Sequence, residues 1–169
     1  MAVNGIEQLC PNCGLCCDST LFADVELRAG DDANRLKQLG LQPHQKTKTK
    51  LAFAQPCACF DGQLCKIYGD RPKRCRLFEC GLLKKVEAGE MTASAALKRI
   101  FEAKTRAEKV RGLLRQSGQR DESMAFTHRY AAAMSAPIDF SNEGEADRRG
   151  ELMLSVNDLM RMLQRDFLQ

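Results

Sequence analysis

The residues best suited to chemistry in this sequence are nine cysteines, which fall into two blocks. The first block places four thiols in the run Cys10-Pro-Asn-Cys13-Gly-Leu-Cys16-Cys17. The second block consists of Cys57, Cys59, Cys65, Cys75 and Cys80. A lone buried cysteine acts as a small apolar side chain, but thiols at this density indicate a metal-ligand set or a disulfide framework.

The expected compartment favours metal over disulfides. The N-terminus has no basic and apolar segments of a secretory signal, and no stretch approaches the roughly 18 apolar residues of a membrane helix. We therefore expect a cytoplasmic protein with no membrane partner. Reducing cytosol keeps thiols free, so dense cysteines there bind metal more often than they cross-link. The adjacent Cys16 and Cys17 and the odd total of nine also fit complete pairing poorly, which leaves thiol redox chemistry and disulfides as minor alternatives.

The spacing of the first block fits two kinds of metal centre. Cys10-Pro-Asn-Cys13-Gly14 has the form of a zinc knuckle, in which Gly14 can take the positive φ that the turn needs. Cys16 extends the run to C-x2-C-x2-C, which is typical of ferredoxins. We expect an iron–sulfur cluster or zinc, and the three-cysteine run favours the iron–sulfur cluster. The second block is too widely spaced for one knuckle, so its cysteines must converge through the fold.

The two blocks together resemble the YkgJ-like CxxCxxCC cysteine-cluster family, which is described as zinc- or iron-chelating. The resemblance covers residues 10 to 80 and rests on Cys10-x2-Cys13-x2-Cys16-Cys17, Cys57-x7-Cys65-Lys-Ile-Tyr68 and Arg71-Pro72-x2-Cys75-Arg76-Leu-Phe78. It implies eight metal ligands, which are Cys10, Cys13, Cys16, Cys17, Cys57, Cys65, Cys75 and Cys80. Cys59 is then the extra thiol, although it could exchange roles with Cys57. Eight ligands could build two four-thiolate sites, or one cluster with several thiols left over.

The resemblance also bears on activity. The flagellin lysine N-methylase is a relative of the family, which implies a redox-active protein or one involved in protein side-chain modification. The sequence has no phosphate-binding glycine loop and no dinucleotide fingerprint, and no catalytic residue is assigned. Two alternatives remain: a zinc-stabilised module whose helical tail binds another protein, and metal storage or delivery. His44 and His128 have no cysteine at ligand spacing and are expected on the surface.

The elements that must position the cysteines predict an α+β fold. We expect a Cys-rich, metal-stabilised region at 1–81 and a helical region at 82–169 packed on it, with a polar loop at 137–150. The first region should contain strands at 21–27 and 46–53, a helix capped by Asp31 or Asp32, and a turn at Asp61-Gly62. Pro72 should start a short helix that carries Cys75 and Cys80.

The second region should contain a long helix capped by Thr92 or Ser94, a helix at 123–136, and a last helix that begins at a capping box, Ser155 to Asp158. Its basic stretch is typical of a solvated helix face, and it lacks the stacking aromatics of a nucleic-acid site. Around Cys75, the cations Arg71, Lys73, Arg74 and Arg76 either offset thiolate charge or form a solvated loop.

Overall fold

The computed structural model describes residues 5–139 and 141–169, and its elements change in character near Gly81. The elements before this point are short: η1 (Ile6–Gln8), α1 (Leu9–Cys13), β1 (Asp24–Glu26), α2 (Ala33–Gln38), β2 (His44–Thr47), β3 (Lys50–Ala54), η2 (Tyr68–Asp70) and α3 (Lys73–Leu77). The elements after it are the helices α4 (Gly81–Glu87), α5 (Ala93–Gln116), α6 (Phe126–Ser135) and α7 (Glu145–Asp166). The fold is α+β, as the sequence predicts.

The sheet is small and antiparallel, with the strand order β1-β3-β2. Val25 pairs with Phe53, and both side chains are buried. The prediction of a single strand at 46–53 is wrong, because the chain turns between Thr47 and Lys50 to form the β2–β3 hairpin. The side chains of β2 are all exposed, so the Lys-Thr alternation there does not mark a buried face.

A first apolar core lies between this sheet and α2. Asp32 caps α2 as predicted, because its carboxylate accepts hydrogen bonds from the Asn34 and Arg35 amides at 2.9 Å. The buried side chains of this sheet core are Val25, Leu36, Leu41, Phe53, Cys59 and Ile67.

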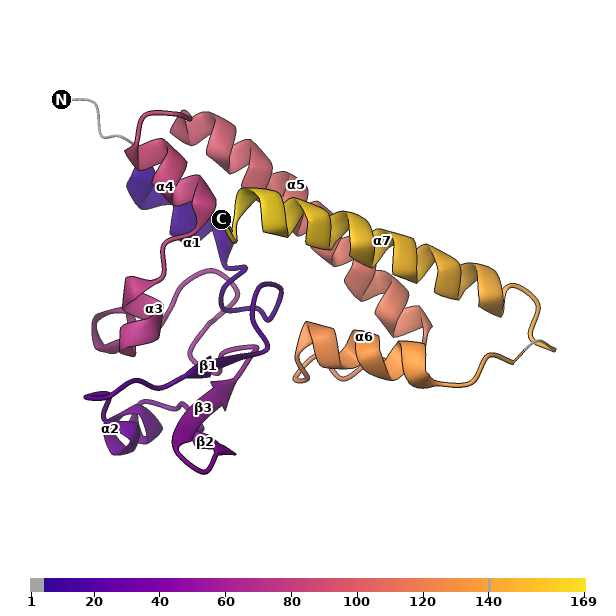
Figure 1. Ribbon diagram of the computed structural model, residues 1–169, viewed down its shortest axis with the longest axis horizontal. Coiled ribbons are helices and arrows are strands. Elements are labelled where there is room, and N and C mark those ends of the chain that lie inside the picture. The colour runs from indigo at the N-terminus through magenta and orange to yellow at the C-terminus, as the bar shows by residue number, and fades with distance from the viewer. Residues whose placement is uncertain (1–4, 140) are drawn as a thin grey trace.

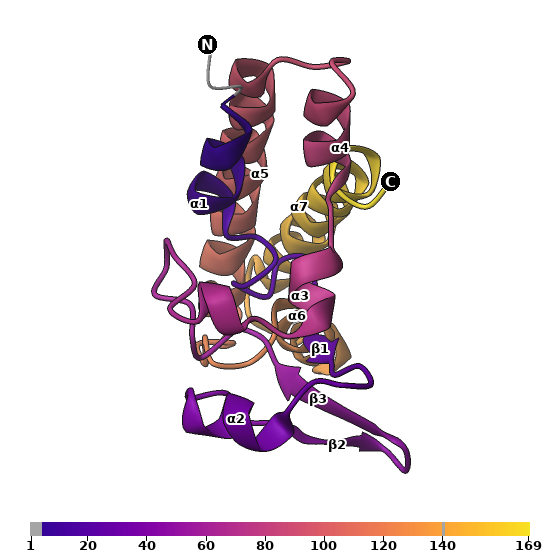
Figure 2. The ribbon, with the colours of Figure 1, turned by 90° about the vertical axis from the view of Figure 1, so that its left-hand side faces the viewer.

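A second, larger core is formed by the helices. Figure 1 shows α5 and α7 antiparallel and side by side, with α6 beneath them at the end of α5 opposite α4. Ala96, Ala103 and Ala107 are fully buried on one face of α5, at the seven- and four-residue intervals of a core stripe. Small side chains there let the neighbouring helices approach closely. In Figure 2 the sheet and α2 lie at the bottom, the helices lie above, and α3 lies between them.

Helix boundaries depart from the sequence prediction in two places. Thr92 caps α5 as predicted, accepting from the Ala95 amide at 3.2 Å. However, α7 begins at Glu145, so Ser155 lies inside this helix and the last part of the predicted 137–150 loop is helical. Two acidic side chains in the first turn of α7 suit the positive end of the helix dipole. Cys80 does not belong to α3; it is the N-cap residue of α4.

The segment after the first cysteine block is tied to the helices by polar contacts. Arg111 of α5 donates to Asp18 Oδ2 at 2.9 Å and to Thr20 Oγ1 at 2.8 Å. Ser19 is buried and has φ of 73°, which non-glycine residues rarely adopt. Its hydroxyl accepts from the buried Phe126 amide at 3.1 Å and so caps α6, whose own N-cap residue, Ala125, offers no side-chain acceptor.

No helix in the described ranges combines the length and the apolar character needed to cross a membrane.

The Ser19 contact generates a stability prediction. Ser19→Ala removes the acceptor of a buried amide, so the free energy of unfolding, measured by urea titration, should fall by about 1–2 kcal/mol. Ser123→Ala is the matched control, because the Ser123 hydroxyl is exposed and bonds only to nearby Asp121. Equal losses in the two variants would show that the Ser19 cap does not hold α6.

Candidate metal centre

One cavity of about 560 Å³ gathers cysteines from both blocks. The cysteines that line it are Cys10, Cys13, Cys16, Cys17, Cys57, Cys65, Cys75 and Cys80. Its other walls come from both cores, with Leu82 and Ile100 on the helical side and Val25 and Phe53 on the sheet side. The cavity therefore lies where the sheet and the helices meet, and it contains every thiol that the family resemblance names as a ligand.

The first block reaches the cavity from a helical turn rather than a zinc knuckle. Cys10 and Cys13 lie on α1, which ends at Gly14 with φ of 74°. A Cβ at Gly14 would lie 2.6 Å from the Phe60 ring, so both the conformation and the packing require glycine. The next turn is closed by a hydrogen bond from the Cys17 amide to the Gly14 carbonyl at 2.8 Å. It brings Cys16 and Cys17 to the cavity together.

Four cysteines of the second block reach the cavity from four separate places in the fold. The Cys57 amide donates to the Cys17 carbonyl at 2.8 Å, which joins the two blocks directly. Cys65 pairs with Phe60 across the predicted Asp61-Gly62 turn. Cys75 lies on α3, and Cys80 precedes the first turn of α4.

Cys59 is the one cysteine that lies outside the lining of the cavity. Its side chain is buried in the sheet core, and its Sγ donates to the Leu39 carbonyl at 3.2 Å. It does not line the cavity, whereas Cys57 does. This placement favours Cys57 over Cys59 as a ligand, and the ligand set itself stays a prediction.

Burial raises the pKa of several thiols that line the cavity. Desolvation is the largest cause that raises the pKa of Cys13 and of Cys17 to about 12 and that of Cys75 to about 11. The negative charge of neighbouring thiolates raises each of these pKa values further. At Cys13, a hydrogen bond from the Leu15 amide lowers the pKa and so opposes the effect of burial. Without a metal these thiols are protonated at neutral pH. A bound metal must therefore displace their protons and supply the positive charge that stabilises thiolate.

The cavity offers thiol ligands that suit a soft metal, but these side chains are not arranged around a single ion. Thiolates are the ligands that zinc and iron–sulfur clusters take. Zn–S bonds of about 2.3 Å would bring four tetrahedral sulfurs to within about 3.8 Å of each other. In the described part of the chain, no three His, Cys, Asp or Glu side chains are arranged to hold a metal ion. Zinc would require the cysteines to move inward, whereas a cluster with an inorganic core spans a wider set of sulfurs.

A buried glutamine adds a second sign of a binding site. Gln55 lies two residues before Cys57, lines the cavity and is only 2% exposed. Its Oε1 is buried and has no hydrogen-bond partner among the described residues. Such an atom normally costs about 1–3 kcal/mol. A half turn of the amide would present its NH2 group instead, and this group can donate to thiolate sulfur.

The cations around Cys75 divide into two pairs. Arg71 and Arg74 line the cavity, whereas Lys73 and Arg76 do not. Arg71 lies 3.5 Å from the centroid of the Tyr68 ring and donates to the Tyr68 carbonyl at 2.9 Å. Burial raises the pKa of Cys10 and of Cys75, and the charge of Arg71 opposes the rise at both thiols. Arg71 is therefore placed to offset thiolate charge, while Lys73 bonds to the Ala29 carbonyl outside the cavity.

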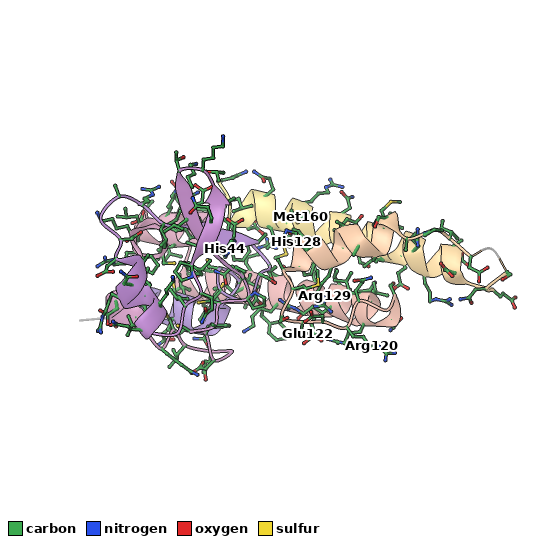
Figure 3. The ribbon with its side chains drawn as sticks, turned by 90° about the horizontal axis from the view of Figure 1, so that it is seen from below. His44, Arg120, Glu122, His128, Arg129 and Met160 are labelled. Carbon is green, nitrogen blue, oxygen red and sulfur yellow. The ribbon has the colours of Figure 1, made fainter. Side chains whose placement is uncertain are left out.

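The histidines take no part in the cavity. His44 belongs to β2 and His128 to α6, and both are exposed, as expected (Figure 3). Sequence reasoning did not single out Gln55 or Arg111. No local pattern marks these two residues, because their roles depend on contacts across the fold.

Comparison with known proteins agrees with this site. Neither the curated proteins nor the solved structures gave a significant match. The CxxCxxCC family model, described as "Putative zinc- or iron-chelating domain", matches residues 9–109, which include both cysteine blocks and most of α5. The match covers more than half of the chain, and the chain therefore belongs to the CxxCxxCC family of zinc- or iron-chelating domains.

Proposed function

We propose that this protein binds an iron–sulfur cluster, in preference to zinc, with ligands drawn from Cys10, Cys13, Cys16, Cys17, Cys57, Cys65, Cys75 and Cys80, and that the bound metal is redox-active. The observation that carries the proposal is the shared cavity, which collects these eight thiols and leaves Cys59 outside. The family supplies the metal-chelating role. The width of the cavity and the C-x2-C-x2-C run support iron–sulfur over zinc.

The surroundings of the thiols suit a centre that changes its charge by one electron. A cluster with four thiolates carries about −2 when oxidised, so each further electron needs compensation. Arg71 and Arg74 supply positive charge at the cavity wall. Phe22 and Phe78, whose rings meet edge to face at 5.0 Å, line the cavity and limit the access of water. Polar groups and apolar surroundings of this kind are what tune the potential of a cluster.

A zinc-stabilised module that binds another protein is the second candidate. Its support is the exposure of large apolar side chains on the long helices. Phe101 on α5 is 73% exposed, and Leu154 on α7 is 67% exposed. Such side chains are compatible with a helical partner surface. The two candidates differ in the metal that they require.

The metal and the colour of the protein distinguish the candidates. After anaerobic purification we expect brown protein with stoichiometric iron and acid-labile sulfide, a visible absorption band near about 400 nm and reversible bleaching by dithionite, as iron–sulfur clusters show. Metal analysis and spectrophotometry provide the measurement. Colourless protein with stoichiometric zinc would support the second candidate and contradict the first.

Cysteine substitutions test the cavity as the binding site. Cys13→Ser should reduce the bound metal, because it removes a thiolate from the cavity wall, and it should lower the melting temperature of the metal-loaded protein. Cys59→Ser is the matched control and should retain the metal content of the wild type. The experiment measures metal per chain together with thermal unfolding. Equal metal loss in both variants would show that Cys59 is a ligand and that the cavity lining does not identify the site.

Gln55 should have opposite effects in the two metal states. Gln55→Leu removes a buried unpartnered amide, so the metal-free protein should be unchanged or up to about 1 kcal/mol more stable. The loaded protein should lose metal to a chelator faster, because a donor to sulfur is gone. Gln63→Leu is the control, since Gln63 lines the same cavity but is exposed. Loss of stability in the metal-free Gln55→Leu protein would contradict this role.

A further inference from the structure

We propose that the cavity holds two separate metal centres side by side. The first set of ligands is Cys10, Cys13, Cys16 and Cys80. The second set is Cys17, Cys57, Cys65 and Cys75. The proposal rests on the metal-binding function proposed above and adds the number of centres and the division of the thiols between them.

The packing of the cysteines separates the two sets. Cys13 and Cys80 pack against the helical core. Cys57, Cys65 and Cys75 pack against the sheet core. Because the cavity is lined by residues of both cores, these five thiols approach it from two different cores, which favours two ligand sets over one.

The first set comes together along α5. Cys10 and Cys13 lie one turn apart on α1, which packs on α5, and Cys80 begins α4, which also packs on α5. Cys16 follows in the next turn, directly after Gly14 and Leu15. Cys13 and Cys80 also pack against the same helical core.

The second set comes together around the segment that follows β3. The Cys57 amide bonds to the Cys17 carbonyl, and the turn at Asp61 brings Cys65 back towards Phe60 and Cys57. Helix α3, which carries Cys75, packs against β1.

The order of cysteines in the chain agrees with the division. A four-iron cluster takes three thiolates from a C-x2-C-x2-C run and a fourth from a distant part of the chain. The first set repeats this arrangement, with Cys80 as the distant ligand. In two-cluster ferredoxins the next cysteine after the run binds the other cluster. Cys17 follows the run here and belongs to the second set. We therefore assign a four-iron cluster to the first set and a second four-thiolate centre to the other.

The two centres must be close neighbours. Cys16 and Cys17 are consecutive residues that serve different sets, and consecutive Cα atoms lie only about 3.8 Å apart. Arg71 lines the cavity that both sets share. This single cation is therefore placed to offset charge at both centres.

Anaerobic loading with iron and sulfide, followed by zinc, tests the division. Bound iron, sulfide and zinc are counted in the wild type, in Cys80→Ser of the first set and in Cys75→Ser of the second. Each single variant should lose one centre and keep the other. The double variant Cys10→Ser/Cys80→Ser should lose no more than Cys80→Ser alone, whereas Cys75→Ser/Cys80→Ser should lose both centres. Cys59→Ser should keep both.

Different results of this experiment would contradict the division into two centres and the proposed function. The division is wrong if the wild type binds only one centre. It is also wrong if each single variant loses all of its metal while its helix content, measured by circular dichroism, is unchanged. Either result leaves metal binding itself in place. A wild type that binds no metal overturns the proposed function itself. A measurement without variants guards against misfolding: cadmium-113 NMR of the wild type loaded with cadmium should show two thiolate-bound cadmium signals at saturation, and a single signal contradicts the division.

Discussion

The thiols of Cys13, Cys17 and Cys75 share one cavity, and they cannot lose their protons at neutral pH unless a metal supplies positive charge. Burial and mutual repulsion hold the pKa of Cys13 and Cys17 at about 12, far above neutral pH. A cation such as Arg71 offsets only part of this charge. On the proposed function, a bound metal supplies the missing positive charge, and its binding contributes to the folding free energy. Such a contribution would suit a chain with 6% aromatic residues and no tryptophan.

The helices fix the position of the cysteine loops as well as covering them. The segment that begins with Cys16 continues into Asp18, Ser19 and Thr20, which bind Arg111 and cap α6. These three residues directly follow Cys17, so a change at this thiol lies next to the contacts with α5 and α6. The family model ends at residue 109, before Arg111 and α6, although both contact the segment that follows the cysteines. The helical part thus contributes to the site as a support for its first block.

Local signals in the sequence predicted much of this arrangement. The helix caps at Asp32 and Thr92 and the positive φ at Gly14 were predictable because each depends on a few neighbouring residues. The capping pattern at Ser155 misled, since the same residue types also occur inside helices. Contacts between residues that are far apart in the chain leave no pattern in the local sequence. The bond from Phe126 to Ser19 and the unpartnered amide of Gln55 depend on residues far apart in the chain. The cysteine run predicted a metal, but the placement of the second block required the fold.

Differential alkylation tests the central claim, that these eight thiols act together on bound metal, more directly than any other measurement. The metal-loaded protein and the same protein treated with chelator are each exposed to iodoacetamide under anaerobic conditions, and every cysteine is quantified by mass spectrometry. The account predicts that Cys10, Cys13, Cys16, Cys17, Cys57, Cys65, Cys75 and Cys80 are protected in the loaded protein and become reactive after chelation, while Cys59 is unaffected by the metal. Several of the eight reacting at the same rate in both states would contradict the account.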